Sequence, residues 1–329
     1  MIIENTNDLC LMGDEYTKSQ LLFTALDINI FEKLNNNKLT IDELSSELNL
    51  NSNAMGRFVN WFTKLNLLEQ NGNTFYNSDF TNKYLVRSSP DNYVEWIIGS
   101  KVFQETLWPK LNQALKTGYD QYGTENQEMW DKFYSNKEEL LEVMSGFDSL
   151  SRTVGRNIIK QYKFKHNSTI VDIGGGSGGL ASEIKKQHPS LNCGVADRED
   201  TIDLAKKHFP YNINHYGVDF LKQDLPKADY MILSWIIHDW DDVSIKKILS
   251  NCHKNLNEGG KIMLIELLPE EDNSFGYWDI MDGHMLLSTS GKERTLDEYK
   301  QLMKVNGFEY LDKFSLNNDF RKVMVYEKK

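Results

Sequence analysis

The sequence has little of what secreted, disulfide-stabilised or membrane-spanning proteins need. Its 329 residues include only three cysteines, Cys10, Cys193 and Cys252, whose spacing matches neither a metal site nor a disulfide framework. Reduced thiols in a cytoplasmic protein are therefore expected. No run of about eighteen apolar residues is present, so no membrane span is expected. The first residues have no basic segment followed by an apolar stretch, which predicts no signal peptide.

A basic charge balance is also missing. The formal net charge is −11 and the pI is near 5.2. A nucleic-acid partner normally needs a basic face, so this balance argues against one. The 40% of hydrophobic residues supply ample material for a core, and the length favours two domains.

The first ~150 residues have mainly helical patterns. An apolar helical stripe runs through residues 21–34, and Thr40 with Glu43 forms a capping box that starts another helix. Further on, two short strands flank Asn71-Gly72, which is a hairpin signal. The order helix, helix, hairpin predicts a winged helix.

Winged helices commonly bind DNA, but the charges of this one argue against that role. The expected recognition helix, about Ser52–Leu65, has only Arg57 and Lys64 as cations, which is a weak phosphate footprint. A dimerisation or structural role is favoured. A non-catalytic DNA-binding regulator remains as an alternative hypothesis.

Residues 93–163 continue the helical pattern and are rich in large aromatic side chains, including Trp130, Phe133 and Tyr134. Such residues are typical of a core. They also suit the wall of a pocket for a flat substrate, because aromatic rings offer a large contact area with fixed geometry.

From residue 169 onward, strand and helix patterns alternate. Strands are expected at 169–173, 192–196, 214–217, 230–234, 261–266 and 322–326. Alternation of this kind predicts a doubly wound α/β domain, in which helices cover both faces of a parallel sheet. Ligands of such sheets bind beyond the carboxyl ends of the strands.

The first of these strands enters a glycine-dense loop. Gly174, Gly176 and Gly179 match the dinucleotide pattern G-x-G-x-x-G. Glycines let the backbone approach a ligand closely, and the following helix offers free N–H groups. Taken alone, the loop fits a nicotinamide cofactor, another adenosine-bearing ligand or a plain turn.

Chemically useful side chains follow the other strands. Asp197 can accept hydrogen bonds from ribose hydroxyls, although it could also cap a helix. Asp219 and Phe220 suit an adenine amine and its ring. His238 can take a proton from a hydroxyl near neutral pH, and Glu266 can orient its imidazole.

Two segments near these residues have purely structural alternatives. Asp239, Asp241 and Asp242 suit the start of a helix that runs to about Leu256, and Gly259-Gly260 could end that helix. No serine or cysteine lies in a nucleophile elbow, so hydrolysis is not expected.

Four motifs occur in a fixed order along the chain: Asp172-Ile-Gly-Gly-Gly-Ser-Gly178, Trp235-Ile-Ile-His-Asp-Trp240, Asn257-Glu-Gly-Gly-Lys-Ile262 and Gly291-Lys-Glu-Arg-Thr295. Together they resemble the S-adenosylmethionine-dependent O-methyltransferases of the plant caffeic acid type and the bacterial anthracycline and phenazine type. The resemblance covers nearly the whole chain. It implies a winged-helix dimerisation domain at 1–92, a helical substrate-pocket region at 93–163 and a Rossmann-like catalytic domain of the class I methyltransferase type at 164–329.

The resemblance also assigns catalytic roles. His238 matches the general base, Glu266 and Glu293 match the two acids that flank it, and Asp239 matches the neighbouring acid. The implied reaction methylates a hydroxyl of an aromatic or polyketide-like molecule in secondary metabolism. The alternative is a family member that decarboxylates, hydroxylates or rearranges its substrate with the cofactor bound.

The implied cofactor is S-adenosylmethionine, with S-adenosylhomocysteine as product and no metal. Its expected contacts are Gly174, Gly176, Asp197, Asp219, Phe220 and Ser234. Ser234 departs from the plant enzymes, which often carry lysine there, but its hydroxyl can still donate a hydrogen bond. The implied acceptor pocket comprises Met144, Phe147, Trp235, Met281, His284 and Met285. The implied partners are a small hydroxylated acceptor and a second copy of the chain. The dimer contacts are expected on helices before Asn36 and near 93–115, with no nucleic acid and no membrane.

Overall fold

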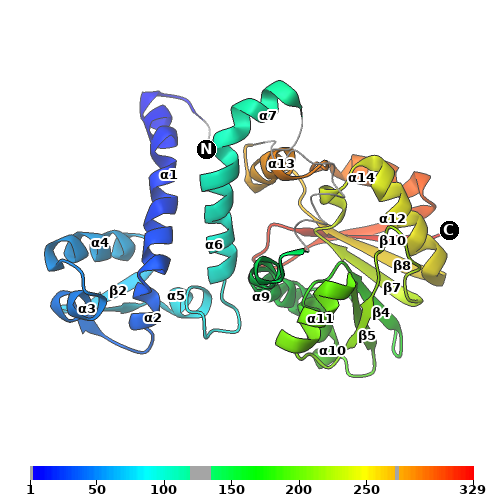
Figure 1. The fold of residues 1–329 in the computed structure, drawn as a ribbon, viewed down its shortest axis with the longest axis horizontal. Helices are drawn as coiled ribbons and strands as arrows, with labels where there is room; N and C mark the ends of the chain where they lie inside the picture. Colours follow the sequence, from blue (N-terminus) through cyan, green and yellow to red (C-terminus); the bar gives the residue numbers. More distant parts are fainter. Residues whose placement is uncertain (1–2, 119–134, 271–273) are drawn as a thin grey trace. The chain divides into compact units, whose positions relative to one another are not determined.

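A computed structural model of the protein describes residues 3–118, 135–270 and 274–329. The chain forms two compact units, Ile3–Lys101 and Val102–Lys329 (Figure 1). The three-part division at residues 92 and 163 stays a prediction. Trp130, Phe133 and Tyr134 of the expected aromatic-rich region lie outside the described residues.

The first unit is mainly helical and contains a small sheet with the strand order β1-β3-β2. Its elements are α1 (Thr6–Asp27), α2 (Ile30–Lys33), β1 (Leu39–Thr40), α3 (Ile41–Leu48), α4 (Ser52–Lys64), β2 (Leu68–Asn71), β3 (Thr74–Asn77), α5 (Asp79–Tyr84) and α6 (Val94–Val102). One apolar core holds it together, with Phe31, Leu44 and Phe62 almost fully buried. Each such side chain contributes about 1.5–3 kcal/mol through burial. The expected order of two helices and a hairpin is confirmed.

Local sequence explains the boundaries of the elements in this unit, and the structure corrects two details of the prediction. Thr40 and Glu43 form the expected capping box of α3. The apolar stripe of residues 21–34 is split between α1 and α2, because Asn29 takes the left-handed conformation. In the hairpin, Asn71 pairs with Thr74, so the turn residues are Gly72 and Asn73 rather than Asn71 and Gly72. Gly72 adopts a φ of +60°, which glycine tolerates without strain.

The second unit is built around a seven-stranded sheet with the order β6-β5-β4-β7-β8-β10-β9. Its strands are β4 (Thr169–Ile173), β5 (Asn192–Asp197), β6 (Asn214–Gly217), β7 (Ala228–Ser234), β8 (Leu256–Glu266), β9 (Phe308–Ser315) and β10 (Lys322–Lys328). Its helical segments are η1 (Phe103–Leu107), η2 (Trp108–Lys110), α7 (Leu111–Thr117), α9 (Lys137–Gln161), α10 (Gly179–Gln187), α11 (Glu199–His208), η3 (Ile237–Asp239), α12 (Asp242–Asn255), α13 (Tyr277–Ser288) and α14 (Leu296–Val305).

The sheet is mixed, not wholly parallel as expected. β6, β5, β4, β7 and β8 pair parallel with one another, but β10 pairs antiparallel with both β8 and β9. The prediction lacked β9, because this edge strand is mostly exposed and contains Glu309, Asp312 and Lys313. The prediction that Gly259-Gly260 could end the preceding helix was also wrong. The helix α12 ends at Asn255, and the two glycines lie within β8.

Helices cover both faces of the large sheet, as predicted (Figure 1). Ile170 and Ile232 point to the face covered by α9 and α10. Val171 and Met231 point to the opposite face, where α12 and α14 pack. This period of two along the strands produces two separate cores. In the described residues, no helix is long and apolar enough to span a membrane.

Candidate active site

The expected site residues gather at one edge of the large sheet. β4 is parallel to β5 and β7, and β7 is parallel to β8, so their carboxyl ends meet. The glycine loop, Asp197, Ser234 and Glu266 follow or end these strands. The predicted juxtaposition is therefore present in the structure.

The loop between β4 and α10 depends on glycine. Gly174, Gly176 and Gly178 have φ values of +72°, +56° and +81°, a region that other residues enter only with strain. A Cβ on Gly174 would also lie 2.5 Å from Cδ1 of Ile236 and 3.6 Å from the Phe220 ring. The loop backbone thus reaches a place where no side chain fits.

Asp197 holds this loop from the end of β5. Its carboxylate accepts hydrogen bonds from the backbone N–H of Gly176 at 2.9 Å and of Arg198 at 2.7 Å. Burial raises its pKa, and these hydrogen bonds partly offset the increase. The N-cap position of α11 is occupied by Arg198, so Asp197 is not the helix cap.

Asp219 and Phe220 lie after β6, beside the glycine loop. Asp219 accepts a hydrogen bond from Leu221 N at 3.0 Å and pairs with Lys222 at 3.0 Å. The Phe220 ring packs edge-on against Trp240, with 5.7 Å between the ring centroids. A hollow of about 230 Å³ lies beside the ends of β5 and β6; it is lined by residues 198–200 and 217–219 and by Gln223.

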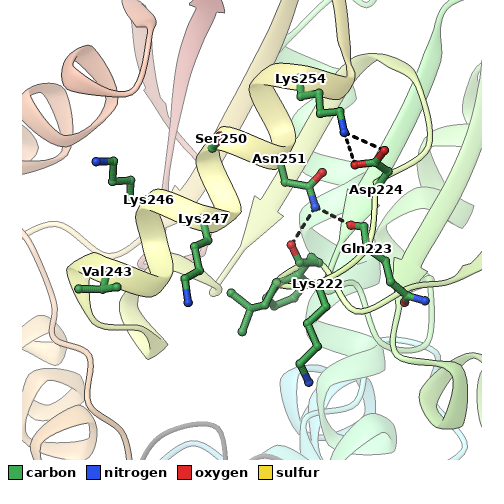
Figure 2. A pocket seen from close by; sticks show the side chains of 11 residues that line it. Lys222, Gln223, Asp224, Val243, Lys246, Lys247, Ser250, Asn251 and Lys254 are labelled. Atoms are coloured by element: carbon green, nitrogen blue, oxygen red, sulfur yellow. Dashed lines mark hydrogen bonds and ion pairs between the residues drawn. The ribbon is translucent and has the colours of Figure 1, made fainter.

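Phe220 also lines a larger and more open hollow of about 490 Å³ between the loop after β6 and α12 (Figure 2). Asn251 ties the loop to the helix by donating to the carbonyls of Phe220 and Gln223 at 2.8 and 2.7 Å. Lys254 pairs with both carboxylate oxygens of Asp224, at 2.6 and 2.8 Å. These bonds fix the loop that carries Asp219 and Phe220.

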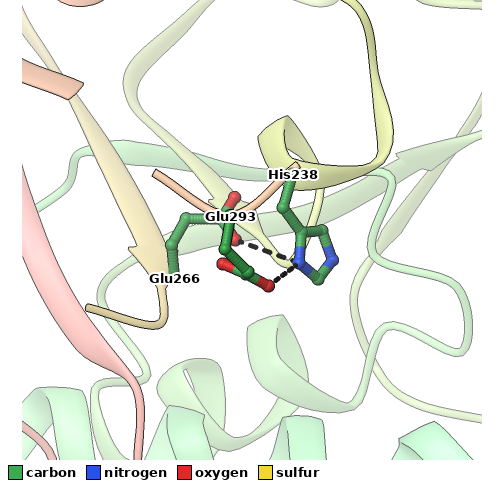
Figure 3. A group of neighbouring side chains, drawn as sticks. All are labelled: His238, Glu266 and Glu293. Carbon is green, nitrogen blue, oxygen red and sulfur yellow. Dashed lines mark hydrogen bonds and ion pairs between the residues drawn. The ribbon is translucent and has the colours of Figure 1, made fainter. Parts of the chain in front are cut away.

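His238, Glu266 and Glu293 form a buried cluster (Figure 3). Nδ1 of His238 lies 2.6 Å from Oε1 of Glu293 and 3.9 Å from Oε2 of Glu266. The other ring nitrogen points away from both glutamates (Figure 3). It lies 3.7 Å from a carboxylate oxygen of Asp239. A proton on Nδ1 thus bonds to Glu293 and leaves Nε2 as a proton acceptor.

Backbone hydrogen bonds hold both glutamates in place. Glu266 accepts from the N–H groups of Ile236 and Ile237 at 3.3 and 2.9 Å. The backbone N–H of Glu293 donates to Asp282 on α13 at 3.0 Å. His238 and Glu293 are each 3% exposed and Glu266 is fully buried, so their mutual interactions are poorly screened by water. The ligand atoms are close enough for a metal ion, but the short hydrogen bond to Glu293 already engages Nδ1, the ring nitrogen that faces both glutamates.

The cluster shares protons among its members. Burial alone would lower the pKa of His238, but the charges of Asp239, Glu266 and Glu293 outweigh it and raise the pKa to about 10. Burial raises the pKa of Glu266 to about 8 and that of Asp239 to about 6. Since these groups are coupled, the cluster as a whole holds a proton at neutral pH and releases it toward alkaline pH.

We expect Glu293→Gln to shift the pH dependence of kcat/KM. A neutral imidazole is needed to accept a proton, so kcat/KM should rise with pH as the cluster deprotonates. Glutamine removes the negative charge beside Nδ1, which lowers the pKa of the imidazole and moves this rise to lower pH. Rate profiles of the wild type and Glu293→Gln test the shift, with Glu43→Gln as a control carboxylate from the capping box of α3. An unmoved or upward-shifted profile in Glu293→Gln would contradict the assigned pairing.

The Gly291–Thr295 segment wraps the turn that carries His238, an arrangement that was not predicted. A Cβ on Gly291 would collide with the carbonyl oxygen of His238. Arg294, which is 3% exposed, donates to the carbonyl of Ile237 at 3.3 Å and to Asp242 at 2.8 Å. The Gly291–Thr295 motif was the only sign in the sequence that this segment matters. The structure shows that Gly291 and Arg294 position the turn that carries His238.

Trp235 connects the histidine to the expected acceptor pocket. Its ring stacks on the imidazole of His238 at 5.9 Å and 23° and meets the Phe147 ring edge-on at 6.0 Å. Its φ of 53° lies in the left-handed region, where the other non-glycine residues in the described part of the chain are all asparagines. Backbone strain of this kind, about 1–3 kcal/mol, is typical of functional sites.

The remaining predicted pocket residues form two groups. Met281 and Met285 of α13 are buried together with Leu267. His284 packs between the rings of Phe103 and Trp108, with centroids 4.9 and 5.6 Å away, and burial lowers its pKa to about 4. Met144 lies in a different cluster, where it contacts residues of α11 such as Ala205. Ser234, which was predicted to contact the cofactor and not the acceptor, is the last residue of β7 and is partly buried.

The chain is similar to known proteins over most of its length. Residues 108–309 match the O-methyltransferase domain, and residues 11–87 match the O-methyltransferase dimerisation domain. The acetylserotonin O-methyltransferases of Gallus gallus and Bos taurus are 29% and 30% identical to the chain, over 88% of both sequences in each case. The crystal structure of human N-acetylserotonin methyltransferase in complex with S-adenosylmethionine superposes with a TM-score of 0.87 at 25% identity, covering 99% of this chain and 98% of that one.

Proposed function

Because the chain belongs to the O-methyltransferase family, we propose that it transfers the methyl group of S-adenosylmethionine to a hydroxyl of a small aromatic or polyketide-like molecule. The observation that carries this proposal is the buried His238, held through Nδ1 by Glu293 at the sheet edge that also bears the glycine loop. The family relationship favours methyl transfer over decarboxylation, hydroxylation or rearrangement.

The residues around the glycine loop fit the cofactor. Gly174 and Gly176 bring bare backbone to the site, and Asp197 suits the ribose hydroxyls. Asp219 and Phe220 suit the adenine beside the 230 Å³ hollow, and Ser234 offers a hydroxyl at the end of β7. When bound, S-adenosylmethionine supplies an electrophilic methyl group on a positively charged sulfur, which an acidic site tolerates well.

His238 is the general base in this proposal. Its Nε2 would accept the proton of the acceptor hydroxyl, and Glu293 holds the Nδ1–H. The oxygen could then take up the methyl group that S-adenosylmethionine supplies, with cleavage of the carbon–sulfur bond and release of S-adenosylhomocysteine. Glu266 and Asp239 stabilise the imidazolium that results. Much of the rate then comes from holding oxygen and methyl carbon close and aligned, with about 10²- to 10⁴-fold more from the base.

The acceptor site is proposed to lie beside the Trp235–His238 stack. Phe147 and Trp235 offer ring surfaces next to the base, and Met281, His284 and Met285 of α13 offer apolar and polarisable surface. Met144 is the sixth proposed member. A neutral His284 adds a hydrogen-bonding group without a charge, which suits an uncharged aromatic acceptor.

The first unit supports assembly in this proposal. Its match to the dimerisation domain favours a homodimer, with contacts on the helices before Asn36 and near 93–115. The proposal involves no metal, no nucleic acid and no membrane, and it assigns the reaction to the cytoplasm.

Calorimetric titration with S-adenosylmethionine and, separately, S-adenosylhomocysteine tests the cofactor assignment. Micromolar binding of both is expected, because the same backbone and carboxylate groups contact the adenosine part of each. Absence of binding by either compound would overturn the methyltransferase proposal and return the glycine loop to the nicotinamide or structural alternatives.

A further inference from the structure

A buried carboxylate on α9 lies directly behind the glycine loop. Asp148 is 7% exposed, and its Oδ1 accepts a hydrogen bond from the Ser177 hydroxyl of the loop at 2.7 Å. The Tyr211 hydroxyl lies 2.9 Å from both carboxylate oxygens, and Nε of Arg152 donates to Oδ2 at 2.9 Å. Asp148 thus links α9 to the glycine loop and to the segment that carries Tyr211.

The fit around this carboxylate is tight. A Cβ on Gly179, the first residue of α10, would lie 2.8 Å from Oδ1 of Asp148. The Ser177 hydroxyl also accepts from the backbone N–H of Gly179 at 3.2 Å. Hydrogen bonds to an ionised acceptor are about twice as strong as neutral ones, so this contact fixes the loop where it turns into α10.

The same turn of α9 also contacts the tryptophan that stacks on the base. Phe147, the residue before Asp148, packs on Trp235, whose ring stacks on His238. The cofactor loop and the aromatic stack beside the base are therefore held by adjacent residues of one helix. Phe147 makes the link to the aromatic stack and Asp148 makes the link to the loop, so loss of the Asp148 carboxylate removes only the second link.

We propose that Asp148 is a positioning residue for the cofactor, which acts through Ser177 to hold the glycine loop in its binding conformation. The loop has three glycines at positive φ, so its unconstrained chain has many alternative conformations. Without the anchor, part of the binding free energy is used to order the loop. This inference rests on the proposed cofactor.

The test measures S-adenosylhomocysteine affinity by calorimetry in Asp148→Ala, Ser177→Ala and the double variant. Each single variant is expected to raise Kd about tenfold, which corresponds to ~1.4 kcal/mol. The double variant is expected to lie within about threefold of the weaker single variant, because both remove the same link. At saturating S-adenosylmethionine, kcat should stay within about threefold of the wild type.

Asn157→Ala is the matched control. It removes a hydrogen bond that a buried side chain of the same helix donates to the carbonyl of Asn317, away from the loop. Its Kd should stay within about twofold of the wild type. Unchanged Kd in Asp148→Ala, fully additive effects, or an equal rise in Asn157→Ala would overturn the proposal. Wild-type protein that fails to bind S-adenosylhomocysteine would instead overturn the proposed function, so the two failures are distinguishable.

Discussion

Replacement of His238 by alanine is expected to lower kcat by about 10²- to 10⁴-fold, the usual contribution of a general base. The imidazole is the group that Glu293 orients at 2.6 Å, and alanine leaves no proton acceptor in its place. Affinity for S-adenosylhomocysteine should change little, because His238 lies outside the glycine loop and the ends of β5 and β6. Steady-state kinetics and calorimetry on the same preparation measure the two effects separately.

His188→Ala provides the matched control, because this histidine is exposed at the end of α10. It should leave kcat and cofactor affinity unchanged. Full turnover in His238→Ala would remove His238 as the base and leave it only a packing role beside Trp235. A large loss of cofactor affinity in His238→Ala would place the defect in binding rather than in proton transfer.

Gly291→Ala is expected to reduce kcat by about 10²-fold, although residue 291 bears no reactive group. The added methyl group would overlap the backbone of His238 and Asp239, so the turn that carries the base must move. Backbone atoms cannot rotate away as a flexible side chain can. A shift of about 1 Å in a catalytic group is enough to cost this much rate.

The neighbouring Ser290→Ala is the control for this prediction, because Ser290 is exposed and alanine removes only a hydroxyl. It should retain wild-type kcat. Gly291→Ala should keep its affinity for S-adenosylhomocysteine, which shows that the protein is folded. Wild-type kcat in Gly291→Ala would mean that the turn moves freely and that the Gly291–Thr295 segment does not position His238.

Periodicity and turn chemistry made much of the fold predictable. β4 and β6 were predicted with their observed bounds, and β5, β7 and β10 were predicted with differences of one or two residues at one end. β8 was predicted to begin at residue 261 but begins at Leu256. The parallel order of the strands was then enough to predict that the glycine loop, Asp197 and Glu266 share one edge of the sheet. These successes share a cause, since buried strands need uninterrupted apolar runs and turns need glycine.

Features that depend on long-range packing were not predictable in this way. β9 is an exposed edge strand, and pairing with β10 rather than its own apolar content specifies it. The contact between Asp148 and Ser177 could not be predicted either, because it joins residues 29 positions apart and no local pattern indicates it. The role of Gly291 required knowledge of which backbone lies against it.

The most direct test of the central claim is a product assay with S-adenosylmethionine that carries a trideuteromethyl group. A panel of hydroxylated aromatic compounds is incubated with the protein and analysed by mass spectrometry. An acceptor that gains one trideuteromethyl group on oxygen is expected, with one S-adenosylhomocysteine formed for each product. An acceptor that is decarboxylated, hydroxylated or rearranged while the cofactor stays intact would contradict this claim.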